Sequence, residues 1–201
     1  MLSVLDIFRI GIGPSSSHTV GPMRIAARFL AEAREAGALA QATKAHVSLH
    51  GSLALTGIGH GTDKAAILGL LGYLPDETDP DEAEAAVKRV RADKRLKLAS
   101  GPDIPFDPAR DIDLRGDIVP SLHPNEMRLS LFGQSGACLF EQTFYSVGGG
   151  FIASSEQLSR PPENDLIGIA GKGAFPFASA AQLLEHCAQR GLNIYDVVLA
   201  N

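Results

Sequence analysis

Gly11-Ile12-Gly13-Pro14-Ser15-Ser16-Ser17-His18-Thr19-Val20-Gly21-Pro22 is the stretch around which the chain is organised. Its first two glycines permit backbone angles that other residues avoid, and Pro14 fixes a turn, so the stretch begins as a loop. Apolar residues then repeat at helical spacing, which predicts a first helix over residues 17–35 that stops near Gly37. A serine-rich loop at a helix start offers N–H groups and hydroxyls to an anion, such as a carboxylate or a phosphate. The alternative is an ordinary helix cap with spare serines.

The composition indicates a globular protein with enough apolar material for a core. Of the 201 residues, 45% are apolar and 20% are charged, and the net charge of -5 argues against nucleic acid as the main partner. No apolar run approaches the roughly 20 residues of a membrane span, and residues 1–6 lack the basic start of a signal peptide. Cys138 and Cys187 are too few for a disulfide scaffold or a cysteine metal site. We therefore expect a cytoplasmic protein with no metal ligands in this chain and no affinity for membranes.

A half-buried strand and a glycine-rich connection follow the first helix. Residues 44–50 alternate between apolar and polar side chains, which predicts the strand. Residues 51–64 contain four glycines and lead to a helix over residues 63–71 that is apolar nearly all round, and such a helix is normally buried. His60 stands between two of these glycines, where the backbone can approach a ligand closely. A lone histidine is more often structural than catalytic, but the flanking glycines favour function.

Two charged runs in the middle of the chain have a structural interpretation. Six acids in residues 75–84 lack the ligand spacing and the glycine of a calcium loop, so we expect Asp79 to cap a helix that begins at Pro80. The basic run of residues 88–97 falls at the end of this helix, where it complements the helix dipole. No aromatic residue interleaves this run, which disfavours a nucleic-acid patch. Residues 104–114 then predict an edge strand punctuated by prolines.

A predicted hairpin and a linker make up most of the remaining chain. Residues 127–132 and 137–147 predict two strands joined by a turn at residues 133–136, and three glycines follow at residues 148–150. His123 and Asn125 stand in a turn before the hairpin, where they are a surface residue and a turn cap unless a further context gives them a role. Residues 153–176 lose the periodic pattern and suggest a linker. The final helical turns are too small for a domain and read as the beginning of a larger one.

Four segments combine glycines with hydroxyl or imidazole side chains. They are Gly13-Pro14-Ser15-Ser16-Ser17-His18-Thr19-Val20-Gly21-Pro22, His50-Gly51-Ser52-Leu53-Ala54 through Gly59-His60-Gly61-Thr62-Asp63, His123-Pro124-Asn125, and Tyr145-Ser146-Val147-Gly148-Gly149-Gly150. In this order they resemble the β (N-terminal) domain of the iron–sulfur L-serine dehydratases, and residues 183–199 resemble the opening helices of their catalytic α domain. The resemblance divides the chain into a β domain over residues 1–155, a linker over residues 156–177 and the start of an α domain over residues 178–201.

The resemblance implies both a fold and a reaction. The fold is α+β, with a mixed or antiparallel sheet packed with helices, similar to the allosteric substrate-binding domain of phosphoglycerate dehydrogenases. The reaction is the dehydration and deamination of L-serine to pyruvate and ammonia, in amino-acid catabolism and gluconeogenesis. It uses a 4Fe-4S cluster held by three cysteines, with one Lewis-acidic iron open to the serine hydroxyl. A base must remove the α-proton; His60 is the preferred candidate and His18 the next. The predicted substrate-binding residues are Ser15, Ser16, Ser17, Thr19, His123, Asn125, Ser146 and Gly148.

The sequence departs from that family because the cysteine-rich catalytic domain is absent, so the cluster ligands would lie outside this chain. We expect an α catalytic domain in cis or a separate α subunit, a homodimer, and no activity on L-serine from this chain alone. One alternative is a non-catalytic regulatory module that binds an amino acid. A serine hydrolase using Ser16 or Ser17 lacks the strand–elbow–helix context, and a pyridoxal-phosphate dehydratase would depend on Lys64 alone.

Overall fold

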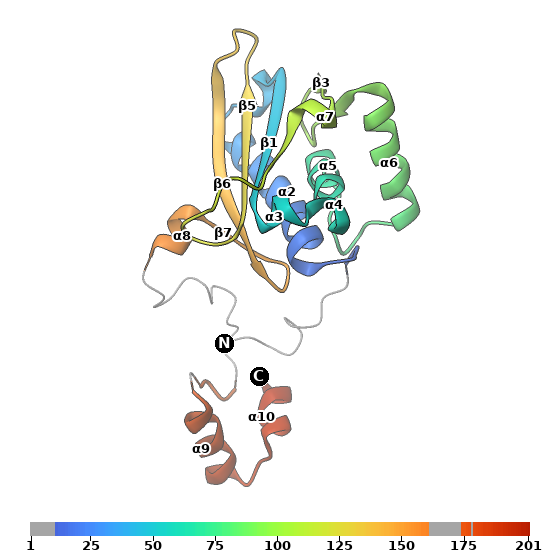
Figure 1. Cartoon of the computed structure of the whole chain (residues 1–201). Coiled ribbons are helices and arrows are strands. Elements are labelled where there is room, and N and C mark those ends of the chain that lie inside the picture. Colours follow the sequence, from blue (N-terminus) through green and yellow to red (C-terminus); the bar gives the residue numbers. More distant parts are fainter. Residues whose placement is uncertain (1–10, 161–173, 178) are drawn as a thin grey trace. The chain divides into compact units, whose positions relative to one another are not determined.

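The computed structural model describes residues 11–160, 174–177 and 179–201, and Figure 1 shows their helices and strands. The described residues fall into two compact units, one of residues 11–159 and one of the residues from 160 onward. In the first unit a five-stranded sheet packs against helices, which confirms the α+β fold. The likeness to the substrate-binding domain of phosphoglycerate dehydrogenases and the boundaries at residues 155 and 178 stay predictions. Most of the expected linker lies outside the described residues.

The sheet of the first unit is mixed, with the strand order β4-β1-β5-β6-β7. β4 runs parallel to β1, whereas each of the other neighbouring pairs is antiparallel. The bounds of the strands are β1 (Lys44–Gly51), β4 (Ile112–Arg115), β5 (Asn125–Phe132), β6 (Cys138–Gly148) and β7 (Phe151–Ser154). The predicted strand over residues 44–50 and the predicted hairpin are confirmed, and β7 is an edge strand that the sequence pattern did not indicate.

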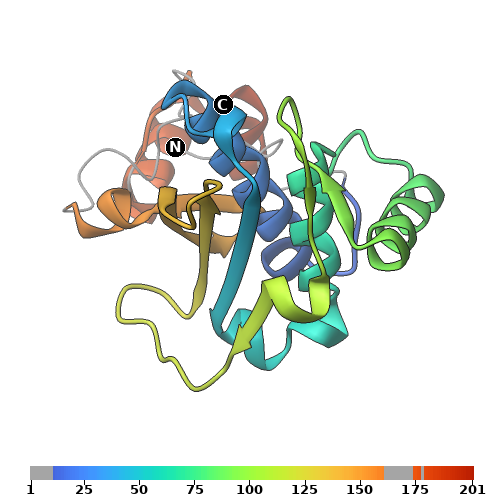
Figure 2. The same cartoon turned by 90° about the horizontal axis from the view of Figure 1, so that it is seen from above.

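Two helices bury one face of this sheet. Alternate residues of β1, such as Val47 and Leu49, are fully buried against α2 (Gly21–Glu35) and α5 (Thr62–Leu71), while the residues between them face the other way. Figure 2 shows both helices on the same side of the sheet. A Cβ at Gly69 would overlap the carbonyl of Met23, so a glycine is needed where α2 and α5 cross. The buried helix predicted over residues 63–71 is thereby confirmed.

Short helical turns occupy two segments for which the sequence predicted something else. The glycine-rich connection contains α3 (Ser52–Leu55) and α4 (Gly57–His60), separated by Thr56. The predicted strand over residues 104–114 is divided into β3 (Asp103–Pro105), α7 (Pro108–Asp111) and β4. Asp107 causes this division, because its carboxylate caps the N–H of Ala109 while Pro108 occupies the first helical position.

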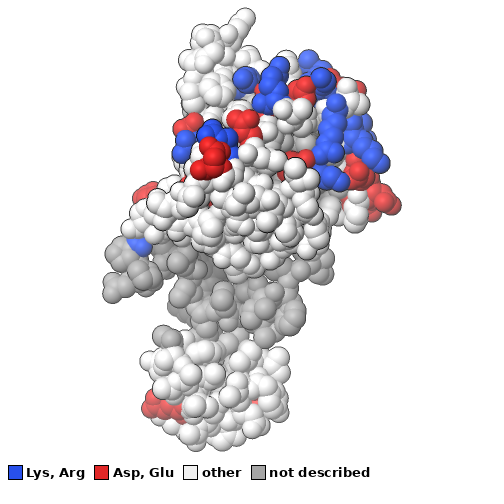
Figure 3. Space-filling view, in the orientation of Figure 1, with Lys and Arg blue, Asp and Glu red and all other residues white. Residues whose placement is uncertain are grey.

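Helix α6 (Pro80–Asp93) and the strand β2 (Arg95–Lys97), which pairs with β3, lie beyond the layer of α5. The carboxylate of Asp79 accepts the N–H groups of Asp81 and Glu82, which confirms it as the cap of α6. Lysines and arginines gather over this region in Figure 3. Many are paired locally with acids, such as Arg91 with Asp63 at 2.7 Å and Lys94 with Asp107 at 2.8 Å. This local pairing favours a solvated, internally balanced surface.

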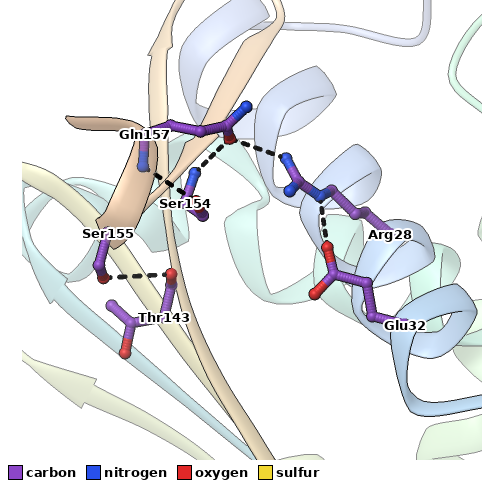
Figure 4. Close-up of polar contacts among 6 residues, drawn as sticks. All are labelled: Arg28, Glu32, Thr143, Ser154, Ser155 and Gln157. Atoms are coloured by element: carbon purple, nitrogen blue, oxygen red, sulfur yellow. Dashed lines mark hydrogen bonds and ion pairs between the residues drawn. The ribbon is translucent and has the colours of Figure 1, made fainter. Parts of the chain in front are cut away.

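The end of the sheet is fastened to α2 by a chain of polar contacts (Figure 4). The short helix α8 (Ser155–Ser159) carries Gln157, whose Oε1 accepts the N–H of Ser154 at 2.8 Å and Nη1 of Arg28 at 3.1 Å. The Arg28 guanidinium also donates to Glu32 at 2.7 Å and lies 5.0 Å from the centre of the Phe144 ring. These contacts join β7, α8 and α2 into one body.

The second unit contains the helices α9 (Ala180–Arg190) and α10 (Ile194–Ala200). Ser179 caps α9, Gly191 ends it in the left-handed region with φ 63°, and Asn193 and Asp196 form a capping box for α10. Leu184, Tyr195 and Leu199 of this pair are more than half exposed. Among the described residues, no helix has both the length and the apolar character that a membrane span requires.

Candidate functional site

The loop at the start of the first helix presents several hydrogen-bond donors. Residues Ser16–Val20 form a π-helical turn that continues into α2, and Ser15 caps it by accepting the N–H of His18 at 3.1 Å. The N–H groups of Ser16 and Ser17 stand in the first turn, where a helix provides no acceptor of its own. Ser16 is also exposed. This end of the helix can therefore bind an anion through N–H groups and hydroxyls.

His18 is held by a hydroxyl at each ring nitrogen. Its Nδ1 lies 2.9 Å from Oγ of Ser17, and its Nε2 lies 3.0 Å from Oγ of Ser52 at the start of α3. Burial lowers the pKa of the His18 imidazole, and the nearby His60 lowers it further. The ring is therefore fixed in orientation and biased toward its neutral form.

His60 lies beside His18, with 4.9 Å between the ring centres. It is the last residue of α4, and Gly61 ends that helix in the left-handed region with φ 63°. Nδ1 of His60 lies 3.0 Å from the carbonyl oxygen of Thr56. Because a carbonyl can only accept a hydrogen bond, Nδ1 carries the proton and Nε2 of the neutral ring carries the lone pair. In the neutral ring, Nε2 of His60 is thus the nitrogen that can accept a proton.

Two threonines lock the histidine-bearing loops together. The hydroxyl of Thr19 donates to the carbonyl of His60 at 2.8 Å, and the hydroxyl of Thr62 donates to the carbonyl of His18 at 2.8 Å. Both threonines are buried, at 4% and 0% exposure. The N–H of Ser15 also donates to the Thr19 hydroxyl, at 3.2 Å. We predicted that Thr19 binds substrate. In the structure its hydroxyl joins two backbone segments, because it accepts the N–H of Ser15 and donates to the carbonyl of His60.

A second group of residues surrounds the start of β5. The N–H of Asn125 donates to Nδ1 of His123 at 3.2 Å, so the neutral His123 ring carries its proton on Nε2. Nδ2 of Asn125 donates to the carbonyl of Ser146 at 3.1 Å, and the N–H of Ser52 donates to the carbonyl of Pro124 at 2.8 Å. Burial lowers the pKa of His123. The Ser52 link joins this group to the His18 group.

The end of β6 packs against the start of α2. Ser146 is fully buried, and its Oγ has no hydrogen-bond partner among the described residues. A Cβ at Gly21 would overlap this hydroxyl, so the strand and the helix approach each other as closely as glycine allows. Gly148 has a positive φ of 96°, and a Cβ there would meet nothing within 4 Å. Ser146 therefore faces the α2 junction, while Gly148 borders open space.

The structure brings the four motifs of the sequence together, and it adds residues that the motifs did not single out. Ser52, Thr56 and Thr62 fix the two histidines. Ser52 and Thr62 each follow a glycine of positive φ, with values of 54° and 63°, and this glycine–hydroxyl pattern could have drawn attention to them. The substrate-binding and catalytic roles of the predicted residues stay predictions.

The segments that build the site contain no Asp, Glu, Lys or Arg. These charge-free segments are residues 10–23, 45–62, 118–125 and 142–155. The same region exposes aliphatic side chains, with Leu55 at 73%, Ile58 at 76% and Val119 at 88% exposure. Imidazoles, hydroxyls and backbone groups therefore supply the polar chemistry of these segments.

The cysteines of this chain do not fit an iron–sulfur cluster. Three or four thiolates are needed, and the sequence contains two cysteines. Cys138 is exposed at the start of β6, whereas Cys187 belongs to α9 in the other unit. No group of three or more His, Cys, Asp or Glu side chains in the described residues is arranged to hold a metal ion.

Comparison with known proteins assigns a family. Residues 3–157 match the family model described as the serine dehydratase beta chain. The chain is 39% identical over 202 residues to L-serine dehydratase 2 of Escherichia coli K12, which matches all of this chain and 43% of that protein. It is 40% identical over 198 residues to the L-serine dehydratase of Helicobacter pylori 26695, covering 98% of this chain and 42% of that protein. The chain thus spans less than half the length of these curated relatives. It belongs to the serine dehydratase beta chain family.

Proposed function

We propose that the protein dehydrates and deaminates L-serine to pyruvate and ammonia, and that this chain supplies one side of the active site. Family membership and the names of the relatives, which are L-serine dehydratases, support the proposal. The structural observation that carries it is the fixed tautomer of His60, whose lone-pair nitrogen belongs to a ring beside the anion-binding helix start. A neutral imidazole and a carboxylate site are two requirements for removing the α-proton of an amino acid.

In the proposed complex the carboxylate of L-serine binds at the start of the helix. The N–H groups of Ser16 and Ser17 and the hydroxyls of Ser15–Ser17 donate to it, and the positive end of the helix dipole favours its charge. This placement would present the α-carbon toward the neighbouring histidine loop. When the α-carbon and the imidazole are held together in one complex, proton removal becomes an effectively unimolecular step.

Nε2 of His60 then accepts the α-proton, while Nδ1 keeps its hydrogen bond to the carbonyl of Thr56. The electron pair of the broken C–H bond forms the Cα–Cβ double bond as the β-hydroxide leaves and takes up a proton to become water. The resulting aminoacrylate is protonated at Cβ to give an imine, and water hydrolyses the imine to pyruvate and ammonia. The depressed pKa of His18 keeps this ring neutral, so it does not repel the imidazolium that forms on His60.

His123 and Asn125 are proposed to orient the other end of the substrate. Nδ1 of His123 accepts the N–H of Asn125, so Nε2–H of the neutral His123 ring remains as a donor. Nδ2 of Asn125 donates to the carbonyl of Ser146, and Oδ1 of Asn125 remains as an acceptor. The serine hydroxyl and ammonium groups match this donor and acceptor.

A further domain or subunit is proposed to complete the site. No group of three or more His, Cys, Asp or Glu side chains in the described residues could hold a metal ion, so the 4Fe-4S cluster that the resemblance implies would need ligands outside this chain. The charge-free segments expose Leu55, Ile58 and Val119, and an apolar surface depleted of charge is typical of the core of a protein interface. The proposed partner is the catalytic α domain, in cis or as a separate subunit, in a cytoplasmic homodimer.

The direct test is the product analysis of the complete enzyme with L-serine. Equal amounts of pyruvate and ammonia are expected, with none from residues 1–201 alone. Serine binding to the complete enzyme without any pyruvate would overturn the proposal and favour a regulatory module. Sedimentation of the complete enzyme tests the homodimer independently.

A further inference from the structure

A buried polar network lies on the face of the sheet opposite α2 and α5. Nδ1 of His50 and Oε1 of Glu126 are 2.6 Å apart, and these residues are 2% and 7% exposed. Nε2 of His50 lies 2.8 Å from Oγ of Ser48. Burial raises the pKa of the Tyr145 hydroxyl, and the Glu126 carboxylate raises it further. None of these residues has a place in the proposed reaction. Buried polar groups that are fully paired give a structure rigidity and a single arrangement.

The network stands where two site-bearing segments leave the sheet. His50 and Glu126 are opposite each other in the β1–β5 pairing, and the next pair is Gly51 with Asn125. Ser52, which holds His18, comes two residues after His50. Asn125 directly precedes Glu126. One cross-strand pair therefore borders both groups of the candidate site.

The backbone beyond this pair is tightly packed. Gly51 has a φ of 54°, and a Cβ at this position would overlap the carbonyl oxygen of Pro124. That same carbonyl accepts the N–H of Ser52 at 2.8 Å. A displacement of β1 relative to β5 at this point would therefore move Ser52 and the His123–Asn125 turn, because Gly51 and Pro124 are already in close contact.

We propose that the His50–Glu126 pair positions the active site by fixing the point at which Ser52 and Asn125 leave the sheet. The inference rests on the proposed function. Removing the carboxylate would leave the buried His50 imidazole without its partner, and the ends of the strands would shift to admit water or another donor. A displacement of about 1 Å at groups that align a substrate can reduce the rate by roughly a hundredfold. His50 and Glu126 act through Ser52 and Asn125, and neither touches the substrate.

The same face of the sheet offers a matched control. Oγ of Ser130 donates to Glu141 at 2.8 Å, and Ser130 is 5% exposed. Ser130 lies four residues farther along β5 than Glu126, which is about 13 Å from it along the strand. Loss of this hydrogen bond weakens the same sheet without reaching the site.

The test compares Glu126→Ala, Glu126→Gln and Ser130→Ala in the complete enzyme. Glu126→Ala should lower kcat/KM for L-serine roughly 10- to 100-fold, whereas Glu126→Gln, whose amide oxygen still accepts from His50, should stay within about threefold of the parent. Ser130→Ala should lower the melting temperature and leave kcat/KM unchanged. Equal kinetic losses in Glu126→Ala and Ser130→Ala, or a failure of Gln to rescue, would overturn the proposal.

A second measurement requires neither catalytic activity nor a Glu126→Ala variant that folds. Nuclear magnetic resonance of residues 1–201 reports the imidazole signals of His18 and His123 and the amide signal of Ser52. Ser48→Ala, which removes the outer hydrogen bond of His50, should move these signals, and Ser130→Ala should not. Signals that stay unmoved in Ser48→Ala contradict positioning. Signals that move while the complete enzyme forms no pyruvate preserve positioning and refute the proposed function.

Discussion

Replacement of His60 by alanine in the complete enzyme gives the sharpest test of the proposed chemistry. Among the described residues, the side chain of His60 makes one hydrogen bond, 3.0 Å from Nδ1 to the carbonyl of Thr56, in an exposed setting. Such a bond contributes about 0.5–1.5 kcal/mol to stability. The structural loss is therefore small, whereas general-base catalysis typically supplies about a hundred- to ten-thousand-fold in rate.

These magnitudes separate a catalytic from a structural His60. A loss of about 1 kcal/mol moves the melting temperature of a domain of this size by roughly 2–4 °C. With a stability of about 5–15 kcal/mol, well under 1% of the protein would unfold at assay temperature, and the rate would hardly change. A fall in kcat of a hundredfold or more therefore cannot come from unfolding.

The assay follows pyruvate at saturating L-serine, with the melting temperature measured on the same samples. Gly59→Ala is the control, because a Cβ at Gly59 meets nothing within 4 Å and the imidazole of His60 remains. This control should stay within a few-fold of the parent. A folded His60→Ala enzyme that retains activity within a few-fold of the parent would refute the assignment of the base, and His18 would be the next candidate.

Three further predictions concern packing, pH and the apolar surface. Gly69→Ala should destabilise residues 1–201 by about 1–3 kcal/mol, because the new methyl group overlaps the fixed carbonyl of Met23; unchanged urea unfolding would contradict the close crossing of α2 and α5. The pKa of His123 is lowered in the folded state, so the folded state binds fewer protons than the unfolded state. The free energy of unfolding should therefore fall as pH drops through the ordinary pKa of 6.5. His123→Gln should flatten this slope in urea titrations above about pH 5. A steeper slope in that variant would show the sign to be wrong. Ile58→Ser, at a side chain that is 76% exposed, should leave the unfolding of residues 1–201 within about 0.5 kcal/mol but lower the activity of the complete enzyme; equal activity would argue against a covering domain.

The sequence predicted the sheet well where the side chains alternate strictly. Residues 44–50 and 127–132 place one apolar set on the helix-covered face, and the structure has both as strands. It failed at residues 104–114, where the cap at Asp107 and the proline after it start a helical turn that competes with the strand pattern. β7 was missed because its short apolar run follows three glycines of positive φ and has little pattern of its own.

Contacts across the fold explain why the site was only partly foreseen. The motifs named His18, His60, His123 and Asn125, and the structure places all four in two linked groups. The residues that orient them are hydroxyls and carbonyls far apart in sequence, such as Ser52 and Thr62. The periodic patterns of a sequence do not predict hydrogen bonds between residues that are far apart in it. Glu126 was overlooked for the same reason, because its partner His50 comes from a different strand.

The charge-free character of the site-building segments has a chemical consequence for the proposed reaction. A carboxylate within about 4–6 Å of an imidazole raises the pKa of the imidazole and so favours its protonated form. Residues 10–23 and 45–62, which carry His18 and His60, contain no such group, and burial lowers the pKa of His18 instead. Hydroxyls and carbonyls orient the rings without charging them. In the proposed reaction these uncharged groups would orient the imidazole that takes the α-proton, while any strong positive charge needed to release hydroxide would come from outside these segments.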